Sequence, residues 1–130
     1  MKRENISTGS KWEPILGYSR AVKVGQFVFV SGTTGGTDAD GKILETTGDQ
    51  TRRALQIILD ALQKAGASAK DVVRTRIFMT DASEWEIVGK IHGEIFGEIR
   101  PALTLVEVSR LIDSAMKVEI EADAVIADGV

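Results

Sequence analysis

The chain has 130 residues, of which 43% are hydrophobic and 27% are charged, so residues 1–130 can bury the core of one globular domain. The absence of cysteine excludes disulfides and cysteine-based zinc or iron–sulfur sites, and a single histidine, His92, cannot build a multi-histidine metal site. The net charge of −3 argues against nucleic-acid binding, and no apolar segment suits a signal peptide or a membrane span. We therefore expect a soluble cytoplasmic protein without a metal or an organic cofactor.

The first predicted strands lie in residues 20–32, RAVKVGQFVFVSG, where side chains alternate with a period of two. Gly25 interrupts this segment and suits a tight turn with positive φ, so the segment predicts a β-hairpin. In the second strand of the hairpin, Phe27, Phe29 and Ser31 share one side.

A helix is predicted from about Thr47 onwards, where the period changes to that of a helix face. The apolar residues with this spacing are Leu55, Ile58, Leu59 and Leu62. Thr47 is expected to cap the amino end of the helix, and Gly66 is a natural stop at its carboxyl end. This helix should lie across a sheet.

The next predicted elements are a strand and a second helix. Residues 72–80 alternate as a strand, with Arg76 and Phe78 on one side. The helix begins near Ser83 and must end before Pro101, because the residue before a proline disfavours helix. Its apolar stripe, which we expect to pack in the core, comprises Trp85, Val88, His92, Ile95 and Ile99.

Two further strands are predicted in residues 100–124, separated by a polar break at residues 111–114. The break is short, which predicts that the two strands are antiparallel neighbours. One side of the second strand carries a row of carboxylates. A solvated outer face accounts for Glu121 and Asp123, whereas Glu119 is the candidate for a functional carboxylate.

The order ββαβαββ, with both helices on one face of the sheet, predicts an α/β two-layer sandwich. The opposite face is then expected to carry a mixed patch comprising Phe27, Phe29, Ser31, Arg76, Phe78, Leu103, Leu105 and Glu107. A single chain would expose this patch to water, whereas a subunit interface would bury it. We therefore predict an oligomer whose sheets pack against one another and whose seams form clefts.

The motifs PALTLVEVSRL, VEIEADA, FVFVSG and LGYSRAVKVG together resemble the RidA (YjgF) family over nearly the whole chain. The resemblance implies a chorismate-mutase-like ββαβαββ fold and a homotrimer with a barrel-like core and three small-molecule clefts between subunits. It also implies hydrolysis of reactive enamines and imines to 2-keto acids and ammonia. Several proteins with this signature carry older labels as translation inhibitors or endoribonucleases.

The resemblance implies site residues as well. The family's tyrosine corresponds to Tyr18, the serine and glycine of its S-G motif to Ser31 and Gly32, and the glutamate of its V-E-I motif to Glu119. Glu119 is expected to be catalytic by accepting a proton from the attacking water, while the Ser31 hydroxyl and the Gly32 N–H stabilise developing charge. Ordinary capping of a strand end is the alternative for Tyr18 and Ser31.

The chain departs from the family at position 103, where Leu103 replaces the arginine of the P-A-R motif. In the deaminating members that guanidinium holds the substrate carboxylate, which a leucine cannot do. We therefore predict that arginine-dependent deamination of 2-imino acids is weak or lost. Leu103 is still expected to line the cleft, together with Phe29 and Glu107. Arg76 either supplies a replacement cation there or forms an intersubunit salt bridge with Glu107.

Three functions are consistent with these residues. The first is metabolite binding in the intersubunit clefts of a homotrimer related to enamine and imine deaminases, with weak C=N hydrolysis. The second is a metabolite-binding or regulatory trimer without chemistry of its own. The third is cleavage of single-stranded RNA, which the acidic net charge disfavours.

Overall fold

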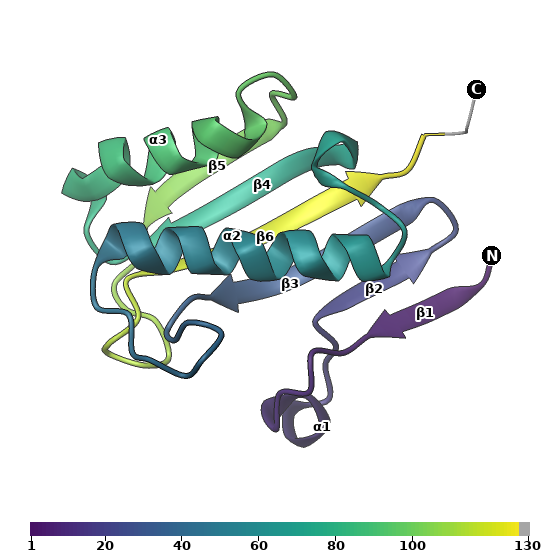
Figure 1. The fold of residues 1–130 in the computed structure, drawn as a ribbon, viewed down its shortest axis with the longest axis horizontal. Coiled ribbons are helices and arrows are strands. Elements are labelled where there is room, and N and C mark those ends of the chain that lie inside the picture. Colours follow the sequence, from purple (N-terminus) through teal and green to yellow (C-terminus); the bar gives the residue numbers. More distant parts are fainter. Residues whose placement is uncertain (128–130) are drawn as a thin grey trace.

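One mixed sheet of six strands forms the body of the computed structural model, which describes residues 1–127. The strands are β1 (Arg3–Ile6), β2 (Ala21–Val24), β3 (Phe27–Thr34), β4 (Val72–Met79), β5 (Ala102–Glu107) and β6 (Val118–Val125). Their order across the sheet is β1-β2-β3-β6-β4-β5 (Figure 1). Neighbouring strands are antiparallel except for β4 and β5, which are parallel. The hairpin predicted around Gly25 is confirmed as β2 and β3.

The helices are α1 (Trp12–Leu16), α2 (Thr47–Lys64) and α3 (Trp85–Phe96), with short 3-10 turns at Ala69–Asp71 and Ala82–Glu84. α2 packs on β3 and β6, and α3 packs beside α2, so that both long helices cover the same face of the sheet (Figure 1). This arrangement confirms the predicted α/β architecture. None of the helices within the described residues has the length and apolar character that crossing a membrane requires.

α2 begins and ends close to its predicted bounds. Its N-cap is Thr46 rather than Thr47, and the Thr46 hydroxyl accepts a hydrogen bond from the Asp49 N–H at 3.1 Å. Gly66 follows the helix with a φ of 82°, which a residue with a side chain rarely adopts, and it ends the helix as expected.

α3 buries His92 but not Trp85. His92 is 7% exposed, and its Nε2 lies 2.9 Å from the hydroxyl oxygen of Thr75 on β4. Burial lowers the pKa of His92, so the imidazole is held in its neutral form. Trp85 is 56% exposed, and its prediction as a core residue was wrong, because it lies at the first position of the helix, where the stripe does not yet face the sheet.

β5 and β6 are not neighbours, contrary to the prediction from their short connection. β6 lies between β3 and β4 and pairs with both of them, while β5 lies at the edge of the sheet. The physical reason is that α3 forms a crossover that returns the chain parallel to β4, and the centre of the sheet is then left for a strand with one fully buried side. The buried residues of β6 are Val118, Ile120, Ala122 and Ala124.

The face of the sheet opposite α2 and α3, the open face, is uncovered within one chain. Phe27 and Phe29 of β3 lie on it with their rings stacked at 6.4 Å, and they are 45% and 49% exposed. The register of β4 with β6 places Arg76 and Phe78 on the same face, as the alternation predicted.

The prediction that Leu103, Leu105 and Glu107 share the open face was wrong. The register of β5 with β4 pairs these residues with Thr75, Ile77 and Met79, which are buried on the side of the helices. Because side chains alternate, assigning one residue of a strand to the wrong face assigns all the others to the wrong face as well. The open face of β5 instead carries Ala102, Thr104 and Val106.

Candidate functional site

A cleft of about 1070 Å³ opens beside the end of β3 and the start of β6. Its walls come from α1, β3, α2, the loop that precedes β6, and β6 itself. Tyr18, Ser31, Gly32 and Glu119 all line it. One chain therefore brings these predicted residues together although they lie far apart in the sequence.

A break in the strand ladder shapes the floor of the cleft. The pairing of β3 with β6 changes register between Val30 and Thr33, which takes Ser31 and Gly32 out of the regular alternation. Irregularities of this kind re-aim side chains next to functional sites. A Cβ atom built on Gly32 would clash with Glu119 Oε2 and lie 3.0 Å from the Glu119 Cδ, so only glycine lets this carboxylate approach the backbone so closely.

Glu119 has the electrostatics of a proton acceptor. Burial raises its pKa, the positive charge of Arg20 opposes that rise, and the negative charge of Glu121 adds to it. A carboxyl group with a raised pKa takes up a proton more readily than a solvated one and so acts as a better general base while ionised. The expectation that Glu119 differs from a fully solvated strand carboxylate is consistent with this setting.

Ser31 is held as a donor inside the protein. Its hydroxyl donates to the Ser19 carbonyl at 2.6 Å, and its backbone N–H donates to the Arg20 carbonyl at 2.9 Å. The hydroxyl proton is therefore committed, while the lone pairs of the oxygen can accept a hydrogen bond from a ligand N–H or from water. Stabilisation of negative charge would fall to the Gly32 N–H instead.

Tyr18 is positioned by a short element that sequence patterns did not reveal. α1 ends at Gly17, whose φ is 74°, and the N–H groups of Gly17 and Tyr18 both donate to the Glu13 carbonyl. Burial of the Glu13 carboxylate opposes its ionisation, but hydrogen bonds from Ser7, Thr8 and Ser10 lower its pKa overall. This buried carboxylate fastens α1, and α1 aims Tyr18 at the cleft.

Arg20 also lines the cleft, and sequence reasoning missed it. Its Nη1 donates to the Gly32 carbonyl at 2.7 Å and to the Thr33 hydroxyl at 2.8 Å, and its Nη2 donates to the Tyr18 hydroxyl at 3.2 Å. The guanidinium also lies over the Tyr18 ring, 5.5 Å from its centroid. The only signal in the sequence was a charged residue directly before a buried strand.

The outer wall of the cleft depends on Gln50 of α2, which is fully buried. Its Nε2 donates to the carbonyls of Leu44 and Ala115, and its Oε1 accepts from the Lys117 N–H. These bonds fasten the loop before β6 to α2. The mouth of the cleft is apolar, with exposed side chains from α1 and from this loop, namely Trp12, Leu16 and Ile112.

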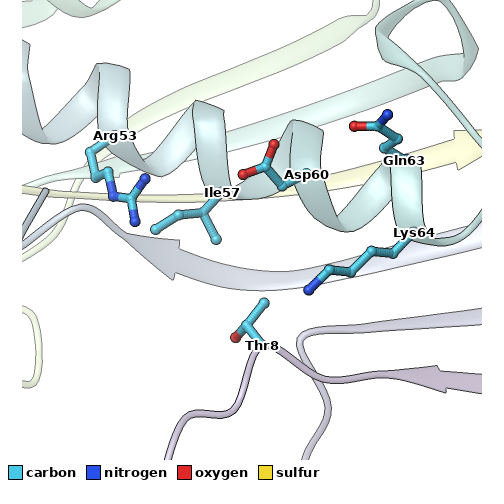
Figure 2. Close-up of a pocket in the computed structure, with 6 residues that line it drawn as sticks. All are labelled: Thr8, Arg53, Ile57, Asp60, Gln63 and Lys64. Atoms are coloured by element: carbon cyan, nitrogen blue, oxygen red, sulfur yellow. The ribbon is translucent and has the colours of Figure 1, made fainter. Parts of the chain in front are cut away.

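A smaller hollow of about 530 Å³ continues from the cleft along α2. Figure 2 shows Arg53, Ile57, Asp60, Gln63 and Lys64 of α2 on one side and Thr8 of the N-terminal segment on the other. Thr8, Arg53 and Ile57 line both spaces. The hollow mixes acidic and basic side chains and contains none of the predicted site residues, which is typical of a solvated groove.

The remaining predicted residues lie elsewhere in the chain. Phe29 is on the open face, and Leu103 and Glu107 are on β5, at the sheet edge farthest from β1. The Glu107 carboxylate accepts a hydrogen bond from the Ala82 N–H at 2.8 Å and thereby holds the turn before α3. Within one chain, none of these residues reaches the cleft.

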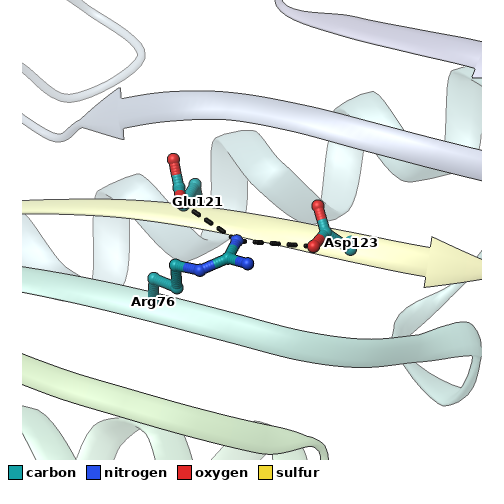
Figure 3. Close-up of polar contacts among 3 residues, drawn as sticks. All are labelled: Arg76, Glu121 and Asp123. Carbon is teal, nitrogen blue, oxygen red and sulfur yellow. Dashed lines mark hydrogen bonds and ion pairs between the residues drawn. The ribbon is translucent and has the colours of Figure 1, made fainter.

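Arg76 is engaged by two carboxylates of its own chain. Its Nη1 lies 3.1 Å from Glu121 Oε1 and 3.4 Å from Asp123 Oδ2 (Figure 3). Within one chain, Arg76 therefore forms ion pairs with Glu121 and Asp123, while the intersubunit salt bridge with Glu107 and the role of a replacement cation both stay predictions. Within residues 1–127, no three His, Asp or Glu side chains gather closely enough to hold a metal ion.

Known proteins resemble this chain over nearly its whole length. The family model for endoribonuclease L-PSP matches residues 8–126. A RutC family protein of Pyrococcus abyssi is 38% identical over 125 residues, which cover 95% of this chain and 98% of that protein. The chloroplastic Reactive Intermediate Deaminase A of Arabidopsis thaliana is 33% identical over 122 residues, which cover 93% of this chain and 65% of that protein. A Mycobacterium tuberculosis crystal structure from the YjgF/YER057c/UK114 family superposes with a TM-score of 0.89 and 48% identity, covering 96% of this chain and 100% of that chain.

Proposed function

Because the chain belongs to the RidA (YjgF) family, we propose that it forms a homotrimer that binds a small metabolite in intersubunit clefts and hydrolyses C=N bonds only weakly. The observation that carries this proposal is the Glu119 carboxylate, with its raised pKa, lying over Gly32 inside a cleft that Tyr18 and Ser31 also line. A plant relative is named a Reactive Intermediate Deaminase, which supports the reaction class.

The trimer accounts for the open face and for the residues that one chain leaves outside the cleft. Phe27 and Phe29 are half exposed on a sheet that the helices do not cover. Sheets of three subunits that face a common, barrel-like core would bury these rings. Edge strand β5 of a neighbouring subunit could then bring Leu103 and Glu107 to the cleft of the first.

The chemistry would proceed by addition of water to the C=N carbon. Glu119, as the carboxylate, accepts one proton from the attacking water, while the Gly32 N–H faces the charge that develops. Return of that proton to nitrogen gives a carbinolamine. Glu119 then takes the proton of the new hydroxyl group and passes it to nitrogen, so that the C–N bond breaks as the C=O bond forms, and ammonia and a keto compound are released. Leu103 supplies no charge to orient a substrate carboxylate, and the loss of such a contact costs about 2–5 kcal/mol.

The test is the release of ammonia from 2-iminopropanoate, generated in place from 2-aminoacrylate. We expect slow turnover by the wild type and a gain of roughly tenfold or more in Leu103→Arg, because a bidentate contact is restored. Glu119→Gln should lose this gain. Fast turnover by the wild type would contradict the loss of the carboxylate-binding arginine.

A second candidate function is metabolite binding without catalysis. It is favoured by the absence of an arginine at position 103, while Tyr18, Ser31, Gly32 and Glu119 still line one cleft. Binding without ammonia release in either the wild type or Leu103→Arg would support it. Ribonuclease activity, after which the matching family model is named, requires that Glu119→Gln abolish RNA cleavage; cleavage by this variant would trace the activity to a contaminant.

A further inference from the structure

Arg20 places a positive charge in the inner wall of the cleft, where Glu119 acts on it only from beyond salt-bridge distance. Arg20 is only 8% exposed to solvent. Within residues 1–127, no carboxylate oxygen lies within 4.0 Å of its guanidinium. Removing a cation from water costs several kcal/mol unless an opposite charge or hydrogen bonds compensate it, so this arrangement needs an explanation.

Three hydrogen bonds hold the guanidinium but leave its charge in place. The acceptors are the Gly32 carbonyl, the Thr33 hydroxyl and the Tyr18 hydroxyl, and all of them are neutral. They fix the plane of the group, as a preorganised binding residue requires. They do not neutralise it.

The guanidinium keeps donors for a ligand. Arginine has five N–H bonds, and the three hydrogen bonds leave the Nε–H and one Nη2–H without an acceptor in the described chain. No fully buried side-chain nitrogen within residues 1–127 lacks a partner, so Nε is not sealed inside the protein. Because Arg20 lines the cleft, the open side of its guanidinium is the cleft side.

We propose that Arg20 is the specificity-determining residue of the cleft and that it binds the carboxylate of a small ligand with an apolar substituent. Two N–H groups on a fixed guanidinium match a carboxylate, and the apolar mouth formed by Trp12, Leu16 and Ile112 suits the rest of such a molecule. The inference rests on the proposed function only in taking this cleft as the ligand site. Arg20 would replace the arginine that is missing at position 103.

Binding and turnover separate under this proposal. A carboxylate held by Arg20 lies beside Gly32 and Tyr18, rather than near β5 of another subunit, where residue 103 lies. The reacting carbon of such a ligand then lies at a different place from the one it would occupy if an arginine at position 103 bound the carboxylate. The wild type is expected to bind 2-keto acids while releasing ammonia slowly.

The experiment compares 4-methyl-2-oxopentanoate with 4-methyl-2-oxopentanamide by isothermal titration calorimetry. The two probes have nearly the same shape, and only the acid carries a charge. For the wild type we expect the acid to bind roughly 10- to 100-fold more tightly than the amide. Arg20→Gln should bind both equally, and Arg20→Lys should retain part of the preference because it keeps the charge but not the fork.

Arg52→Gln is the matched control, because it removes the same charge from an exposed position of α2 that is paired with Glu94, and it should keep the preference of the wild type. Equal binding of acid and amide by the wild type would overturn the role of Arg20 and leave the proposed function intact. No binding of either probe would contradict both. A preference that survives in Arg20→Gln but is lost in Arg53→Gln would overturn the proposal in favour of the other arginine that lines the cleft.

Should Arg20→Gln fail to fold, the comparison of acid with amide in the wild type and in Arg20→Lys still decides the matter. A carboxylate preference that is larger in Arg20→Lys than in the wild type would contradict binding by the guanidinium fork. A purely structural Arg20 would lower the affinity for acid and amide alike and leave their ratio unchanged.

Discussion

The cleft and the open face are both incomplete in a single chain, but they lack different things. The cleft holds Arg20 by three hydrogen bonds to neutral acceptors, and what it lacks is a carboxylate in direct contact with that guanidinium, since Glu119 acts on it from a longer distance. On the open face, Arg76 contacts Glu121 and Asp123, and what this face lacks is cover for Phe27 and Phe29.

Each deficit indicates a different partner. An uncompensated buried cation is satisfied by an anion, which a small ligand can supply. Exposed, stacked rings are buried when another apolar surface packs on them, and a second copy of the chain can supply that surface. The difference teaches that two arginines of one chain play different parts. Arg76 is engaged by two carboxylates, whereas Arg20 keeps N–H groups that can bind a ligand.

The largest effect is expected on the open face. Phe29→Asp would place a carboxylate in the interface that we propose, and burying an unpaired charge there should weaken assembly by roughly 100-fold or more. Sedimentation velocity at micromolar concentration should then report single chains for the variant and an oligomer for the wild type.

Ile43→Asp is the control for this substitution. Ile43 is 68% exposed, but it lies in the loop before α2 and not on the open face. Its substitution should leave assembly unchanged. A wild type that sediments as a single chain would contradict the interface. The open face would then need no second copy of the chain to cover it.

The sequence predicted the elements whose signals are local. The hairpin needed only alternation and Gly25, and α2 needed only its apolar face and its terminal Gly66. It did not predict β1 or α1. α1 has only five residues, and its stability comes from hydrogen bonds to the buried Glu13 carboxylate, which are tertiary contacts.

The site was predictable only in part, for a related reason. Motif resemblance found Tyr18, Ser31, Gly32 and Glu119, which the fold gathers around one cleft. Arg20 escaped notice because its burial depends on acceptors that lie 12 and 13 residues further along the chain. Alternation reveals that a strand has two faces but not which of them is covered by helices.

The second effect in size is expected inside the cleft. Gly32→Ala would force the new methyl group against the Glu119 carboxylate, and overpacking of this kind costs about 1–3 kcal/mol. Urea unfolding should show the loss. Because the contact lies within one chain, the loss should not change with protein concentration, in contrast to that of Phe29→Asp.

The matched control is Gly89→Ala on α3, where an added Cβ meets nothing within 4 Å. Alanine in a helix should stabilise the protein by about 0.5–1 kcal/mol over glycine. Equal effects of the two glycine substitutions would show that Glu119 does not press on Gly32.

The smallest effect concerns the pH dependence of stability at Glu119, and it tests the charge deficit of the cleft directly. Below pH 4.5, the ordinary value of the pKa, the carboxyl is protonated in both the folded and the unfolded chain. As the pH rises above that value, the unfolded chain ionises first, because burial raises the pKa in the folded chain. The wild type should therefore lose stability relative to Glu119→Gln until the pH passes the folded pKa.

Urea unfolding of both proteins over a pH series measures this difference, and the contribution of His92 is common to the two chains and cancels. The expected curve for Glu119→Gln minus wild type rises above pH 4.5 and then levels off. A curve that falls instead would mean that Arg20 stabilises the ionised carboxylate more than burial opposes it. Arg20 would then have its counter-charge within the chain, and the cleft would offer no free cation to a ligand.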